Sequence, residues 1–221
     1  MYLPKSLLYF PPAEKTHPSG IIALGGDLSV ERLILAYQSG IFPWYDDQSE
    51  PITWWCPEQR MVVIPNEYKP SKSTRNIINR GIFTVTMNQS FEEVIKNCQT
   101  IRRSGQEGTW INNKIVKAYT ELHKKGLAKS VEVWQDDKLV GGLYGVDLGN
   151  GIFCGESMFS KVSNASKVAF AWLNTYLKEN NYLLLDCQLY NDHLASLGAF
   201  EIDRKVFMQI LEHAQNKTPK P

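Results

Sequence analysis

Hydrophobic and polar positions change their spacing along the chain, and these changes predict its secondary structure. Between residues 165 and 179 apolar side chains recur every three or four positions, which predicts a helix with a buried face. Alternating runs over 129–135 and 138–148, joined by Asp136-Asp137, predict a β-hairpin. Further strands are expected over residues 61–64, 83–87, 152–156 and 182–188.

Polar residues in front of apolar runs mark the starts of further helices. Ser90 with Glu93 forms a capping-box pattern, and Asn112 is a favourable N-cap. Asp27 and Ser29 can cap a short helix near the N-terminus. The helices expected in this way cover residues 30–39, 73–80, 90–100, 112–126 and 192–197, with a last helix that Asp203 caps.

The order of these elements predicts an α+β fold with two domains. Residues 1–62 are rich in proline, glycine and aromatic residues, so we expect a small N-terminal domain that is irregular up to residue 60 outside its helix. In residues 63–221, three antiparallel strands are followed by a helical crossover and another strand. This is the core topology of the N-acetyltransferase-like (GNAT-like) fold, a mixed sheet flanked by helices, although topology alone does not establish function.

Composition excludes several classes of protein. The 221 residues are 43% hydrophobic and 21% charged, which is typical of a globular protein and not of a disordered chain. No apolar run approaches the ~18 residues of a membrane span, and the first residues do not resemble a secretory signal. We therefore expect a cytoplasmic protein that does not bind a membrane.

Charge is nearly balanced in total but uneven in its distribution. The 24 basic and 23 acidic residues give a net charge of +1, which by itself argues against a polyanionic partner. Residues 68–91, however, contain no acidic residue, and their basic residues are Lys69, Lys72, Arg75 and Arg80. This stretch is either an ordinary solvated helix face or a patch that contacts phosphates.

Cysteine and histidine positions do not indicate a metal site. The four cysteines at 56, 98, 154 and 187 are widely scattered, and they are not clustered with the histidines at 17, 123, 193 and 213. A zinc site usually requires closely spaced pairs of such ligands. We expect reduced thiols and no bound metal.

Two groups of residues are candidates for chemistry. Tryptophans at 44, 54, 55 and 110 lie in irregular chain, where they form either an aromatic core or a surface on which bases stack. Asp186 and Gln188 end an apolar strand, and strand alternation places them on one face with Cys187 on the other. Because of that opposite orientation, Cys187 and His193 are a poor candidate for a nucleophile and its base.

Several ordered motifs together resemble one bacterial enzyme family, the leucyl/phenylalanyl-tRNA–protein transferases. The match runs in order from about residue 7 to residue 210, and its motifs are Gly20-x-x-Ala23-Leu-Gly-Gly-Asp-Leu28, Ala36-Tyr-x-x-Gly-Ile-Phe-Pro-Trp44, Trp54-Trp-x-Pro57, Glu107-Gly-Thr-Trp-Ile111, Gly141-Gly-x-Tyr-Gly145, Phe153-Cys-Gly-Glu-Ser-Met-Phe-Ser160, Asn164-Ala-Ser-Lys167 and Asp186-Cys-Gln-x-x-Asn-Asp-His193. The resemblance implies an aminoacyltransferase that moves Leu or Phe from aminoacyl-tRNA to the α-amine of a protein with N-terminal Arg or Lys. Because an apolar pocket discriminates by only ~1–3 kcal/mol per methylene, we expect Met to be a weaker donor. The product would be marked for degradation by the N-degron pathway (the N-end rule).

The resemblance also implies roles for individual residues. It assigns catalysis to Asp186 and Gln188, and binding of the acceptor peptide to Glu156 together with Asp186. It assigns binding of the 3′-terminal adenosine of the tRNA to Trp44, Trp110, Tyr37 and Tyr119. The apolar pocket for the donor side chain would comprise Leu143, Phe153, Met158, Phe170, Leu173 and Leu185, and tRNA contacts would come from Lys72, Arg75 and Arg80.

The implied reaction is aminolysis of an ester that is already activated by its bond to the tRNA ribose. No cofactor is therefore expected. We expect Asp186 to orient Gln188 by a hydrogen bond, so that the Gln188 carbonyl accepts from the incoming amine. Two other functions remain open at this point, an N-acetyltransferase that uses acyl-coenzyme A and a tRNA-binding module without catalytic activity. An N-acetyltransferase needs a glycine-rich loop that binds the pyrophosphate of coenzyme A, and this sequence lacks one. A tRNA-binding module would leave Asp186 and Gln188 without a role.

Overall fold

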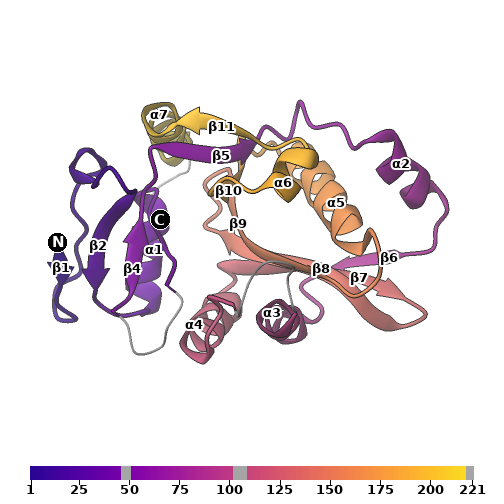
Figure 1. Cartoon of the computed structure of the whole chain (residues 1–221), viewed down its shortest axis with the longest axis horizontal. Helices are drawn as coiled ribbons and strands as arrows, with labels where there is room; N and C mark the ends of the chain where they lie inside the picture. The colour runs from indigo at the N-terminus through magenta and orange to yellow at the C-terminus, as the bar shows by residue number, and fades with distance from the viewer. Residues whose placement is uncertain (46–50, 102–108, 218–221) are drawn as a thin grey trace.

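The computed structural model describes residues 1–45, 51–101 and 109–217, which form two sheets side by side (Figure 1). Helix α1 (Val30–Gln38) packs beside the smaller sheet, and a 3-10 turn η1 (Ala13–Lys15) precedes it. The strands of the smaller sheet lie in the order β1 (Tyr2–Leu3), β2 (Ile21–Gly25), β4 (Thr53–Trp55) and β3 (Phe42–Pro43).

The larger sheet contains the core topology that the sequence predicts, with β11 as a strand that it does not predict. Its strands lie in the order β11 (Phe200–Asp203), β5 (Gln59–Val63), β10 (Leu184–Gln188), β9 (Ile152–Ser160), β8 (Lys138–Asp147), β7 (Ala128–Gln135) and β6 (Thr84–Met87). Neighbouring strands are antiparallel except β9 and β10, which are parallel and joined by helix α5 (Ala165–Glu179). The hairpin, the third strand and the helical crossover are therefore confirmed.

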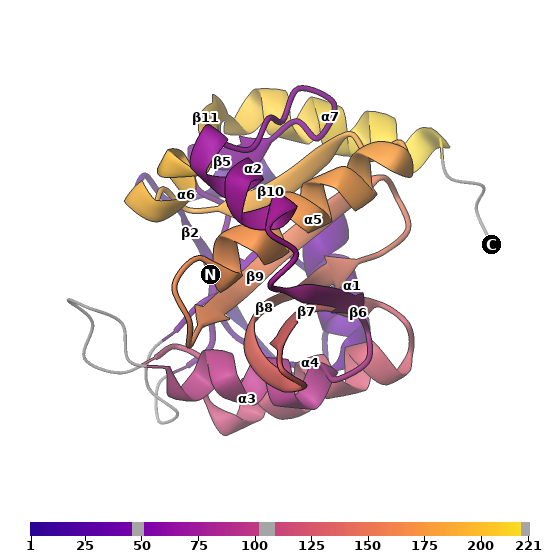
Figure 2. The ribbon, with the colours of Figure 1, turned by 90° about the vertical axis from the view of Figure 1, so that its right-hand side faces the viewer.

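Helices cover both faces of the larger sheet. Helix α5 lies on one face, with α2 (Lys72–Asn79) and α6 (Asp192–Ser196) nearby (Figures 1 and 2). Helices α3 (Phe91–Thr100) and α4 (Asn113–Lys124) lie on the other face, and α7 (Arg204–Lys217) packs near β5 and β11. None of the helices in the described part of the chain is long and apolar enough to cross a membrane.

Local sequence explains where several elements begin and turn. The Asn112 side chain accepts hydrogen bonds from the backbone N–H groups of Lys114 and Ile115, and thereby caps α4 as expected. Asp136 and Asp137 both adopt left-handed φ angles, 49° and 58°, which a tight two-residue hairpin requires.

Two expectations of local structure are wrong. The Ser90 side chain does not cap α3; its hydroxyl donates to the Glu93 carboxylate at 3.2 Å, while the Ser90 backbone N–H donates to buried Glu132. Strands β2, β3 and β4 occupy a region that we expected to be irregular. They are two to five residues long, too short for alternation to be detected, and they form only because they pair with one another.

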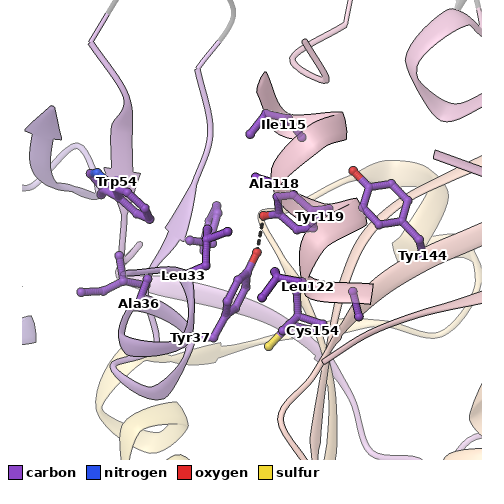
Figure 3. Close-up of a cluster of buried hydrophobic side chains, with 14 of the residues drawn as sticks. Leu33, Ala36, Tyr37, Trp54, Ile115, Ala118, Tyr119, Leu122, Tyr144 and Cys154 are labelled. Atoms are coloured by element: carbon purple, nitrogen blue, oxygen red, sulfur yellow. Dashed lines mark hydrogen bonds between the residues drawn. The ribbon is translucent and has the colours of Figure 1, made fainter. Parts of the chain in front are cut away.

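A continuous apolar cluster joins the two sheets. Leu33 and Tyr37 of α1 pack towards Ala118 and Tyr119 of α4, as Figure 3 shows, and Phe207 of α7 belongs to the same cluster. The predicted domain boundary at residues 62 and 63 falls inside β5, a strand of the larger sheet. The division into residues 1–62 and 63–221 stays a prediction.

Candidate active site

A cavity of about 620 Å³ lies where the two sheets meet. Strands β8, β9 and β10 and helices α5 and α6 form most of its wall. The remainder comes from Phe42 of β3, from Trp44 just after that strand, from Trp110 just before α4, and from Ile101 and residues 189–191. Residues that are far apart in the sequence therefore share one cavity.

One part of the cavity is apolar. The structure places five of the six predicted donor-pocket residues in its wall: Leu143, Met158, Phe170, Leu173 and Leu185. The sixth, Phe153, does not line the cavity and is fully buried in the core behind it. An apolar pocket of this kind suits an aliphatic or aromatic side chain.

Two of the predicted aromatic residues line the same cavity. Trp44 and Trp110 are both partly buried, and the Trp44 ring lies 5.3 Å from the ring of Trp55 at a tilt of 57°. The Trp55 indole N–H donates to the Trp44 carbonyl at 2.8 Å, which holds that stretch of chain in place. Residues Glu107 and Gly108 of the motif before Trp110 lie outside the described residues.

Glu156, on β9, is the centre of a buried polar cluster beside the cavity. Its Oε1 accepts from the Tyr37 hydroxyl at 2.7 Å and from Gln188 Nε2 at 2.8 Å, and its Oε2 accepts from the Tyr119 hydroxyl at 3.2 Å. The two tyrosine hydroxyls also hydrogen-bond to each other (Figure 3). Tyr37 and Tyr119 do not line the cavity; they hold Glu156, which does.

Burial controls the ionisation of this cluster. It raises the pKa of Glu156 to about 7, although hydrogen bonds from the two tyrosines act to lower it, and nearby Asp186 raises it further. Burial, followed by the charge of Glu156, also raises the pKa values of Tyr37 and Tyr119 well above their usual range. The tyrosines are therefore protonated donors, and Glu156 changes its charge near neutral pH.

Asp186 is fully buried and does not line the cavity. Its carboxylate receives two hydrogen bonds from Arg60, at 2.8 Å from Nε and 2.6 Å from Nη2. Arg60 is not among the site residues predicted from the sequence. The paired charges mean that the negative charge of Asp186 is already neutralised in this structure.

Gln188 occupies an irregular end of β10. A β-bulge lies between residues 186 and 188, and Gln188 has a left-handed φ of 67°. Its backbone N–H donates to Asp186 Oδ1 at 2.9 Å. The expected hydrogen bond between Asp186 and Gln188 therefore exists, but it comes from the Gln188 backbone, while the side-chain amide reaches Glu156.

The bulge also corrects an expectation about Cys187. Strand alternation placed Cys187 and Gln188 on opposite faces, but both line the cavity, and so does His193. The Cys187 thiol donates to the Leu185 carbonyl, and burial raises its pKa far above the usual range. The thiol is thus not activated, which argues against a nucleophile on chemical grounds, not on grounds of orientation.

The predicted tRNA-binding residues lie elsewhere. Lys72 and Arg75 are exposed on α2, and Arg80 is exposed at its C-terminal end. None of the three lines the cavity, and α2 lies beyond α5 as seen from the smaller sheet (Figure 1). The structure does not bring this patch together with the other predicted site residues.

Arg60 could have been suspected from the sequence by one signal. It stands at the start of the apolar run Met61-Val62-Val63, and alternation places it on the same face as Val62. A charged residue on a buried face needs a partner. The sequence does not say which of the acidic residues is that partner.

In the part of the chain that the structure describes, the cysteines and metal-ligand residues add no second centre. All four cysteines are buried there, and none is in a disulfide. Within the described residues, no group of three or more His, Cys, Asp or Glu side chains could hold a metal ion.

Comparison with protein families gives two matches along the chain. Residues 62–212 match the model "Leucyl/phenylalanyl-tRNA protein transferase", and residues 26–58 match the model of that family's N-terminal domain. A leucyl/phenylalanyl-tRNA–protein transferase of Flavobacterium johnsoniae is 62% identical over 93% of this chain and 96% of the relative. One from Thermodesulfovibrio yellowstonii is 48% identical over 98% of this chain and 87% of the relative.

Solved structures support the fold. The crystal structure of FemX superposes with a TM-score of 0.50 over 83% of this chain and 71% of that one. Only 11% of the aligned residues are identical, so the likeness concerns the fold alone, which is the GNAT-like α+β arrangement.

Proposed function

The chain belongs to the leucyl/phenylalanyl-tRNA–protein transferase family, and from this premise we propose how its cavity carries out the transfer. The protein is an aminoacyltransferase that moves Leu or Phe from aminoacyl-tRNA to a protein. The observation that supports this location best is one cavity with an apolar wall, two tryptophans and a hydrogen bond between Gln188 and buried Glu156.

The donor would bind along the length of the cavity. We place its Leu or Phe side chain against Leu143, Phe170 and Leu173, where apolar burial favours both amino acids. Met is similar in volume to Leu and Phe, and an apolar pocket discriminates only weakly between such side chains. Met should therefore also be transferred, as a weaker donor. Trp44 and Trp110 would hold the terminal adenosine, because aromatic faces stack well on bases.

Catalysis would depend mainly on placing the amine beside the ester. The amine nitrogen bonds to the ester carbonyl carbon, the bond from that carbon to the ribose oxygen breaks, and one amine proton ends on the ribose hydroxyl. The Gln188 Nε2 group donates to Glu156, which leaves the amide oxygen to accept from the amine. Positioning of this kind can contribute roughly 7–11 kcal/mol in ideal models.

The acceptor would be a protein with Arg or Lys at its N-terminus. Glu156 lies in the cavity wall, and its carboxylate, when ionised, can attract such a cationic side chain. Asp186 is paired with Arg60, so its part would be to position Gln188 and not to bind the acceptor directly. This narrows the role that the resemblance implied for Asp186.

The cellular consequences follow from the same proposal. A new N-terminal Leu or Phe would mark the product for degradation by the N-degron pathway. Aminoacyl-tRNA is made and used in the cytoplasm, so the enzyme would act there. Lys72, Arg75 and Arg80 would contact the body of the tRNA, at a distance from the cavity.

A transfer assay tests the proposal directly. Labelled Phe on Phe-tRNA is offered to a peptide that begins with Arg and, as the control, to one that begins with Gly. Labelled Leu-tRNA and Met-tRNA are then compared with it. We expect transfer to the Arg peptide alone, with Met the weakest donor. Equal labelling of both peptides would refute the assignment of the acceptor.

A further inference from the structure

One buried side chain joins the two sheets at the edge of the cavity. Arg60 is 2% exposed and pairs with Asp186 of β10 through two hydrogen bonds. Its Nη1 donates to the Gly40 carbonyl at 3.1 Å. Its guanidinium lies over the rings of Phe42 and Phe207, at 4.6 and 4.5 Å from their centres. One residue of β5 thus contacts three separate segments: β10, the chain from Gly40 to Phe42, and α7.

The chemistry of this site requires an arginine. Burial alone would lower the pKa of the Arg60 guanidinium, but the adjacent Asp186 carboxylate raises it, so the group stays charged. The planar guanidinium binds both carboxylate oxygens and stacks on aromatic rings at the same time, which an ammonium group cannot do. A buried ion pair is often no more stable than an apolar replacement, so stability alone does not explain it.

The same carboxylate controls the conformation of Gln188. Asp186 Oδ1 accepts from Arg60 Nε at 2.8 Å and from the Gln188 backbone N–H at 2.9 Å. Gln188 is held in a left-handed conformation that residues other than glycine rarely adopt. In this conformation its side-chain amide reaches Glu156.

Arg60 also acts on the opposite wall of the cavity. Its contacts with the Gly40 carbonyl and the Phe42 ring hold β3, and Phe42 lines the cavity together with Trp44 two residues later. The Arg60 guanidinium therefore holds two parts of the cavity wall in place relative to each other: the strand that carries Gln188 and the segment that carries Trp44.

We propose that Arg60 is a positioning residue for the transfer reaction, which holds Asp186 and, through it, the Gln188 backbone and amide in the geometry that receives the amine. The inference rests on the proposed function, because it concerns the rate of that reaction. Arg60 itself does not line the cavity and has no direct contact with the reacting atoms.

The first test compares Arg60→Met and Arg60→Lys with the wild-type enzyme. We expect kcat to fall on the order of 100-fold in Arg60→Met, as for other small misplacements of reacting groups, with a smaller change in KM for Phe-tRNA. Arg60→Lys keeps the charge and should restore part of kcat. If Arg60→Met does not fold, the Lys variant alone decides the test. An unchanged kcat in a folded Arg60 variant would overturn the proposal.

Arg32 is a matched control within the same chain. It is also buried, at 1% exposure, and it binds Asp27 and the carbonyl groups of Pro4, Lys5 and Leu7, none of which lines the cavity. Arg32→Met should lower thermal stability while leaving kcat within about twofold of the wild-type value. If it lowers kcat as strongly as Arg60→Met, the effect is one of general stability and the proposal fails.

A double-mutant cycle tests the route through Asp186. If Arg60 acts through that carboxylate, Arg60→Met should cause little further loss of kcat in a protein that already carries Asp186→Asn. Multiplied losses would show independent effects and contradict the proposal.

Hydrogen exchange at the Gln188 backbone amide provides a readout without transfer. We expect faster exchange in Arg60→Met and an unchanged rate in Arg32→Met. If wild-type protein shows no transfer, the proposed function fails, while this exchange measurement still decides whether Arg60 holds Gln188.

Discussion

The two parts of the cavity are built on different physical principles. The apolar part gathers side chains such as Phe170 and Leu173, which are interchangeable in kind and contribute in proportion to the area they bury. The polar part consists of Glu156, Gln188 and the Arg60–Asp186 pair behind them, where each group depends on a named partner. Substitutions should therefore cause graded effects in the first part and abrupt effects in the second.

The largest effect should follow from breaking the buried ion pair. Asp186→Asn leaves the Arg60 charge without a counter-ion in the protein interior, which costs about 3–5 kcal/mol in typical cases. Thermal unfolding and the transfer assay should show this loss together. Asp27→Asn is the matched control: Asp27 is 31% exposed, and Arg32 keeps the carbonyl acceptors of Pro4, Lys5 and Leu7, so the loss should be smaller. Equal losses of stability and transfer in the two variants would show that the polar part of the cavity is no more sensitive than an ion pair elsewhere in the protein.

A second effect should appear in the dependence of stability on pH. Glu156 has a pKa of about 7 in the folded protein and near its usual 4.5 when unfolded, so the folded state binds more protons between those values. The free energy of unfolding should then fall as pH rises through that window, by up to about 3 kcal/mol. Denaturant unfolding across the window should show the fall in the wild type but not in Glu156→Gln. Parallel curves for the two proteins would contradict the assigned pKa.

A smaller effect is expected in the apolar part. Leu173→Val removes one methylene from the cavity wall and should alter the ratio of kcat/KM for Phe and Leu by less than about tenfold, since one methylene contributes about 0.8 kcal/mol. Competition between differently labelled Phe-tRNA and Leu-tRNA measures this ratio. Complete loss of transfer with both donors would show that the apolar part is as sensitive as the polar one.

The smallest effect on the cavity should come from the distant basic patch. Neutralising Lys72, Arg75 and Arg80 should leave the donor ratio unchanged, because none of them lines the cavity. It should reduce the slope of log affinity for tRNA against log salt concentration by about 2. An unchanged slope would show that the patch is an ordinary solvated surface.

Sequence patterns predicted the larger sheet better than the smaller one. Helix α5 and the hairpin of β7 and β8 are long enough for periodicity to show, and α4 has its cap in the residue before it. The strands of the smaller sheet are too short for this, and their aromatic residues also suit irregular chain. Strand pairing, which is a tertiary interaction, decides their structure.

The candidate site was predicted unevenly for a similar reason. Motifs located Glu156, Gln188, Trp44 and most of the apolar wall, because each lies in a short recognisable segment. The bulge at Gln188 escaped the strand pattern, since alternation assumes an unbroken ladder. For this reason the predicted orientation of Cys187 was wrong.

The sequence by itself determined the helices, the hairpin and the kinds of residue that the site uses. Local periodicity and capping are interactions between near neighbours, so they can be detected within a few residues. Only the tertiary structure decided that Arg60 pairs with Asp186, 126 residues further along the chain, and that Tyr37 and Tyr119 hold Glu156. Burial decides these pairings. A charged or polar group that folding removes from water must form its hydrogen bonds with the protein groups that surround it.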